Sequence, residues 1–147
     1  MSEPRISKVH HNPTSGLVTI QFHHVENDGQ DTIESTLKSK DAPLPAFLEA
    51  LGALSPVIVK LAELPEGYLD TVRGVSLHRD PEEPETFTVT YCGTKRVAAS
   101  HSPIIVNTPS VAPPEDDGEE NLIPNVLEAA KDYLAGKRAQ ADLGLEG

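Results

Sequence analysis

Alternating apolar and polar residues predict β-strands in the first forty positions of the chain. Val18, Ile20 and Phe22 alternate with polar residues, which is the period-two pattern of a half-buried strand. Runs at 6–11 and 32–38 flank this segment, and turn-forming residues join the three. The N-terminal part therefore predicts three antiparallel strands.

The spacing of apolar residues changes to three and four between Leu44 and Leu61, which is typical of one face of a helix. Asp41 is a candidate N-cap for this helix, and the prolines after it fit a first turn. Pro56 lies inside the pattern and predicts a kink or interruption near Ser55, because proline cannot donate a backbone hydrogen bond.

Two further strands are predicted at 71–79 and 86–92, and the run that begins at Ile104 is a candidate edge strand. The rings of Phe87 and Tyr91 share one side of their strand, so we expect them in the core. The predicted fold class is α+β. It has an antiparallel sheet with the element order β-β-β-α-β-β, a possible edge strand, one covering helix and a tethered C-terminal helix.

Composition divides the chain into a predicted α+β domain at 1–110, an acidic, proline-rich linker at 111–121, and an amphipathic helix with its tail at 122–147. A helix of roughly 14 residues is marginal alone in water, so it must pack on something. Its own domain, a second copy of the chain and a foreign partner are the alternatives. A second copy docked through this helix or through the edge strand would form a homo-oligomer.

The net charge narrows the possible partners. The chain has 147 residues with 12 basic and 23 acidic side chains, a formal charge of −11 that repels duplex DNA and anionic membranes. Five of the acids lie in the run Glu115–Glu120, which weakens, but leaves open, an interpretation as an acidic DNA mimic. Because the sequence has no long apolar run and does not begin like a signal peptide, we expect a cytoplasmic protein without membrane contact.

Residues that could support catalysis or bind metal are sparse. The single Cys92 excludes an intramolecular disulfide, and we expect it to be a small buried residue. The doublets His10-His11 and His23-His24 do not converge, since neighbours on a strand point to opposite faces. We therefore predict no metal, no cofactor and no enzymatic activity, with a small hydrolase using His and Asp or Glu as the alternative.

Two basic segments are candidate binding residues. Thr94, Lys95 and Arg96 form a predicted turn that offers donors to a phosphate or a partner's carboxylate, and otherwise is a solvated turn. This turn is the basis for an alternative function, the binding of nucleotides or single-stranded nucleic acid. Lys137 and Arg138 follow the C-terminal helix, where they either form a docking peptide or compensate the helix dipole after a glycine cap.

Several short segments of the sequence are the basis of a resemblance to a known family. They are Val72-Arg73-Gly74-Val75-Ser76, Ile105-Val106-Asn107-Thr108-Pro109, the Leu51–Pro65 helix ending in Glu63-Leu64-Pro65, and Ala129–Leu143 with Gly136-Lys137-Arg138-Ala139-Gln140. These segments, which extend over most of the chain, resemble a family of small proteins encoded by tailed bacteriophages and prophages. The resemblance implies a phage-encoded cytoplasmic accessory protein and carries over no catalytic residues. We therefore expect a non-catalytic protein that binds a host or phage protein and acts on host defence or phage DNA metabolism.

Overall fold

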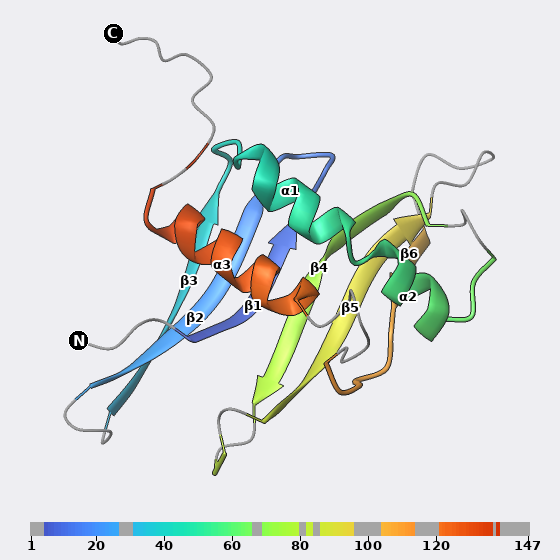
Figure 1. Ribbon diagram of the computed structural model, residues 1–147. Helices are drawn as coiled ribbons and strands as arrows, with labels where there is room; N and C mark the ends of the chain where they lie inside the picture. The colour runs from blue at the N-terminus through green and yellow to red at the C-terminus, as the bar shows by residue number, and fades with distance from the viewer. Residues whose placement is uncertain are drawn as a thin grey trace, which may run out of the picture.

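The fold is an antiparallel sheet with helices on one side (Figure 1). The computed structural model describes residues 5–26, 31–65, 69–79, 82–83, 86–95, 104–113, 121–136 and 138. Its strands are β1 (Arg5–His11), β2 (Val18–Glu26), β3 (Asp31–Ser39), β4 (Thr71–Arg79), β5 (Phe87–Lys95) and β6 (Ile104–Asn107). They form one sheet in the order β3-β2-β1-β4-β5-β6, which confirms the predicted α+β class and the edge strand.

The sheet consists of two antiparallel ribbons joined at β1 and β4. β1 pairs with β2 along its length, whereas its register with β4 covers the three residues Lys8, Val9 and His10. The register of β1 also shifts between Ile6 and Lys8, which marks a bulge at Ser7. As a result, the N-terminal end of β1 and the C-terminal end of β4 diverge (Figure 1).

The predicted central helix is present, interrupted where Pro56 suggested. It forms α1 (Pro45–Gly52) and α2 (Ser55–Leu61), with Pro56 in the first turn of α2. Proline is tolerated there because the first N–H groups of a helix have no intrahelical acceptor. The break lets Phe47 and Leu51 of α1 and Ile58 of α2 all reach the sheet as the chain turns across it.

The prediction that Asp41 caps this helix is wrong. The N-cap of α1 is Leu44, which makes no side-chain capping hydrogen bond, and Pro45 occupies the first turn. The Asp41 carboxylate instead lies 2.8 Å from Nη1 of Arg138, at the other end of the chain. The Asp41 side chain therefore forms a long-range ion pair and does not cap the helix, contrary to the prediction from the local sequence pattern.

The C-terminal helix packs on its own domain. α3 (Leu122–Leu134) lies beside α1 on the same face of the sheet (Figure 1) and contacts α1 and β1. It buries Ile123, Val126, Ala130 and Tyr133 in the core that the strands and α1 also form. The Tyr133 hydroxyl donates to the carbonyl oxygen of Asp41 at 2.7 Å. The helix is thus part of the main hydrophobic core.

The segment before α3 continues along the sheet. Val111 exchanges two backbone hydrogen bonds with Val89 of β5, at 2.7 and 3.0 Å, so the first residue of the predicted linker pairs with the sheet. The acidic run at 115–120 lies outside the described residues. Tyr91 of β5 is fully buried on the helix side, and Phe87 packs against that core, which places both rings where the strand pattern predicted.

Candidate functional site

The face of the sheet opposite the helices is polar, and we refer to it as the open face. In each strand, residues that alternate with the buried apolar ones point away from the helices. Two rows cross the strands: Lys38, Thr19, His10, Gly74, Cys92 and Asn107 form one, and Thr36, Gln21, Lys8, Ser76 and Thr90 form the next. None of the described helices covers this face (Figure 1).

The open face is cationic although the chain is acidic. The registers place Arg5, Lys8 and Lys38 on it, and Arg73 is the bulged residue of β4 between Val72 and Gly74. A bulge aims its extra side chain away from the regular alternation, and the charge of Arg73 acts on the open-face residues His10 and Cys92. Glu34 is the acidic residue that the described strands bring to this face. Positive charge therefore predominates here.

Gly74 allows the centre of the open face to pack closely. A Cβ atom at this position would lie 2.6 Å from Cδ2 of His10 and would overlap the carbonyl oxygen of Val9. Only a residue without a side chain fits between β1 and β4 at this point. The His10 imidazole therefore lies directly over the backbone of β4, next to the Arg73 bulge.

The electrostatics of this centre are unfavourable for a further positive charge. Burial, followed by the charges of Lys8 and Arg73, lowers the pKa of His10 from 6.5 to about 4. Cys92 is buried, which confirms the expectation of a small buried residue, and this burial raises the pKa of its thiol. Nε of Arg73 is buried and has no hydrogen-bond partner among the described residues. Lys8 and Arg73 thus present positive charge and an unused donor, a combination that favours an anion.

The pKa of His10 leads to a prediction about stability. Because this pKa is lower in the folded protein than the ordinary 6.5 of an unfolded chain, the unfolded chain binds the proton first as the pH falls. Stability should therefore decrease between pH 6.5 and about 4. At a partly open site we expect His10→Gln to remove about 1 kcal/mol of the loss between neutral and mildly acidic pH. Urea unfolding of both proteins at the two pH values measures this, and equal pH slopes would contradict it.

Comparisons with known proteins do not assign a function to the open face. No protein family, curated protein or solved structure matches the chain. Within the described residues, no helix is both long and apolar enough to cross a membrane.

The predicted site at the end of β5 has a structural partner. Nζ of Lys95 lies 4.0 Å from Oδ1 of Asp70, an acid that is distant from Lys95 in sequence and that the fold brings next to it. The Thr94 side chain is buried, and its carbonyl accepts a hydrogen bond from the Asp70 N–H at 2.9 Å. Arg96 lies outside the described residues. The prediction of a turn at Thr94 and Lys95 is wrong, because both residues continue β5 and pair with Ile105 and Ile104 of β6. The ion pair reduces the charge that Lys95 offers to a ligand, and the binding role of this segment stays a prediction.

Arg138 contacts residues of its own domain. Its guanidinium lies 4.2 Å from the centroid of the Tyr133 ring, pairs with Asp41, and donates through Nε to the Tyr133 carbonyl at 3.2 Å. Gly136 takes a positive φ of 93° after the helix, as a glycine C-cap does. Lys137 lies outside the described residues. Arg138 thus contacts Ser39 and Asp41 at the end of β3. The docking of a partner by the segment after α3 stays a prediction.

One histidine and two hydroxyl groups form a hydrogen-bonded chain on the open face. The Thr90 hydroxyl lies 3.3 Å from Nε2 of His78 and 2.9 Å from Oγ of Ser110. In the described part of the chain, no carboxylate completes this pair in the way a hydrolase triad requires. The same residues contain no cluster of three or more metal-ligating side chains.

Sequence reasoning missed Lys8 and Arg73 as candidate binding residues. Neither has a basic neighbour along the chain, so no local motif marked them. They come together because β1 pairs with β4, although 65 positions separate Lys8 from Arg73 in the sequence. The available signal was the strand alternation itself: Lys8 alternates with Val9 on a predicted strand, which assigns it to the polar face.

Proposed function

We propose that the protein is a non-catalytic binding protein that presents the open face of its sheet to an acidic surface of a partner protein. The observation that carries the proposal is charge segregation. Arg5, Lys8, Lys38 and Arg73 gather on one face of a chain with a net charge of −11. The resemblance to phage proteins supports a host or phage protein as this partner.

The side chains of the open face favour a protein over single-stranded nucleic acid. A sheet that binds single strands stacks bases on exposed aromatic rings. Here the rings of Phe22, Phe87 and Tyr91 lie on the helix side, and the open face has threonines, serines and amides between its cations. Such a surface donates hydrogen bonds and positive charge to carboxylates, as the polar rim of a protein interface does.

Binding of a defined acidic peptide tests the proposal. We expect a fluorescent oligoglutamate to bind the full-length protein at low salt and to dissociate as salt is added, since exposed charges are screened. The double variant Lys8→Gln, Arg73→Gln should weaken this binding about tenfold, because it removes two cations and an unused donor. Fluorescence anisotropy measures both affinities.

A matched control separates the open face from net charge. Lys60→Gln combined with Lys131→Gln removes the same charge from α2 and α3, on the helix side, and should leave peptide affinity unchanged. Equal loss in the two double variants, or no binding by the unaltered protein, would overturn the proposal. Tighter binding of oligo-dT than of the peptide, lost in the open-face variant, would assign the face to nucleic acid.

A further inference from the structure

The two edges of the sheet differ in how they are protected against pairing with another strand. β6, the edge strand that the sequence predicted, has four residues, and so short a strand offers few free backbone groups. β3, at the other edge, has nine residues and pairs with β2 at every one of them without a register shift. No strand or bridge of the described residues lies on its outer side. β3 therefore presents a long, regular row of backbone N–H and C=O groups to a further strand.

The hairpin of β2 and β3 extends beyond the rest of the sheet. The register of β1 with β2 reaches His23, so within the described residues no third strand accompanies the pairs between 24–26 and 31–33. Figure 1 shows this end of the hairpin projecting past the helices. Ile33 lies there on the helix side of β3 and is exposed. Because a two-stranded ribbon is only marginally stable in water, a further strand beside β3 would stabilise this end.

The charges of β3 favour a second copy of the same strand, running in the antiparallel direction. Glu34 and Lys38 lie four residues apart on the open-face side of β3, and both are exposed. The ion pairs within the described part of the chain involve neither of them. If Thr36 lies opposite Thr36 of the second copy, Glu34 of each copy lies opposite Lys38 of the other. Two ion pairs then flank a threonine pair, and both kinds of cross-strand pair are favourable.

The same register also covers apolar surface on the helix side of β3. It makes Ile33 of one copy a diagonal neighbour of Leu37 of the other, a separation that long side chains can bridge. A parallel pair of β3 strands in matching register would instead bring Glu34 beside Glu34 and Lys38 beside Lys38, which is destabilising. Charged side chains protect an edge strand against most other strands. On β3 they are arranged so that an antiparallel copy of the strand satisfies them.

We propose that β3 is a self-association edge through which two copies of the chain form a dimer, with Thr36 on the two-fold axis and Glu34 of each copy paired with Lys38 of the other. The two β3 strands join the sheets of the two copies into one. The axis is perpendicular to this sheet, so both open faces lie on the same side of the dimer. The inference goes beyond the proposed function and does not depend on it, because the strand pairing needs no acidic partner.

Charge reversal tests the two ion pairs. We expect sedimentation velocity of the full-length protein to show a concentration-dependent dimer at low salt, which dissociates as salt screens the charges. Glu34→Lys and Lys38→Glu should each weaken the dimer about tenfold or more, because each substitution turns two attractive pairs into two repulsive ones. The double variant, with both substitutions in one chain, restores the pairs and should dimerise again. An equimolar mixture of the two single variants should form a mixed dimer for the same reason.

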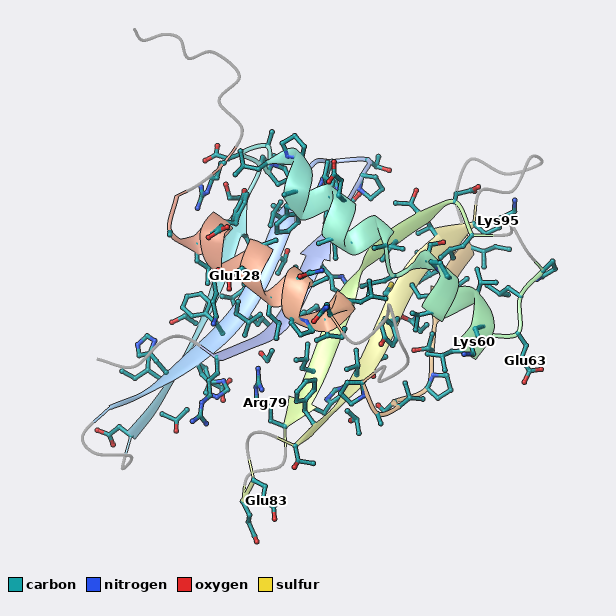
Figure 2. The ribbon with its side chains drawn as sticks, in the orientation of Figure 1. Lys60, Glu63, Arg79, Glu83, Lys95 and Glu128 are labelled. Atoms are coloured by element: carbon teal, nitrogen blue, oxygen red, sulfur yellow. The ribbon has the colours of Figure 1, made fainter. Side chains whose placement is uncertain are left out.

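A matched control separates these pairs from the net charge of the chain. Glu63→Lys makes the same change in charge as Glu34→Lys at an exposed position after α2, at the other end of the molecule from β3 (Figure 2). It should leave the dimer unchanged. A monomer at every concentration, a dimer that neither reversal weakens, or a dimer that the double variant does not restore would overturn the proposal.

Cross-linking tests the register of the two strands. Thr36→Cys places a thiol on the two-fold axis, so oxidised glutathione should link two copies through a disulfide between opposite residues. Thr32→Cys, on the same face of the same strand, is the control and should not form this link, since in the proposed register its two copies lie far apart. The native Cys92 is buried in both variants. Equal cross-linking of the two variants would contradict the proposed pairing.

Discussion

Replacing Tyr133 by Ala is expected to lower the free energy of unfolding by about 3–5 kcal/mol, the range observed when large buried aromatic side chains are truncated. Tyr133 is among the largest fully buried side chains and packs against Phe47, with ring centroids 5.6 Å apart. Its ring also carries the guanidinium of Arg138. The substitution therefore leaves a cavity between α3 and α1 and removes the ring on which the Arg138 guanidinium rests. Chemical denaturation of the full-length variant measures the change.

Two companion variants separate packing from the hydrogen bond. Tyr133→Phe removes only the hydroxyl that donates to the Asp41 carbonyl at 2.7 Å, and should cost about 1 kcal/mol. Glu128→Ala changes an exposed position of the same helix (Figure 2) and should stay within about 0.5 kcal/mol of the unaltered protein. If Tyr133→Ala is as mild as Glu128→Ala, α3 does not belong to the cooperative core.

Much of the fold follows from local patterns in the sequence. The alternation at Val18, Ile20 and Phe22 produces a strand with its apolar side against the helices, because side chains on a strand point to alternate faces. The three-four spacing after Leu44 produces the helical segment, and Pro56 marks its interruption. These features need information from only a few neighbouring residues, which explains why the element order and the edge strand could be predicted.

The candidate site could not be predicted in this way, because it depends on which strands pair. The bulge at Arg73 arises in the pairing of β4 with β5, and the short register between β1 and β4 arises where the two ribbons meet. No local period in the sequence encodes either feature. The same limit explains Asp41 and Lys95. Each was interpreted by its neighbours in sequence, and each is paired in the fold with a residue distant along the chain, Arg138 and Asp70 respectively.

The net charge of the chain was a poor guide to what the open face can bind, for a related reason. A total of −11 describes the potential far from the molecule, whereas a ligand at the sheet meets the few charges that share its face. Within about a Debye length of the open face, Lys8 and Arg73 outweigh acids that lie elsewhere on the chain. An acidic protein can therefore hold an anion locally while its overall field keeps away larger polyanions such as duplex DNA.

The junction between β1 and β4 gives the second prediction of a large effect. Gly74→Ala is expected to destabilise the protein by about 3 kcal/mol or more, because forced overlap at a packed position is among the few strongly destabilising mechanisms. The added Cβ would overlap the Val9 carbonyl oxygen and lie 2.6 Å from Cδ2 of His10. The atom that the Cβ would overlap, the Val9 carbonyl oxygen, belongs to the backbone in the centre of the sheet. Since β1 and β4 pair over a short register, the overlap cannot be spread along a longer ladder.

Gly52→Ala is the matched control, since it makes the same chemical change in open space. A Cβ atom at Gly52 meets nothing within 4 Å, and Gly52 is the last residue of α1. Alanine is the better helix former, so this variant should be neutral or more stable by up to about 1 kcal/mol. Urea unfolding should therefore show a large loss of stability for Gly74→Ala and no loss for Gly52→Ala. Equal stability of Gly74→Ala and the unaltered protein would show that β1 and β4 do not approach closely at this point, and would remove the basis for placing His10 beside Arg73.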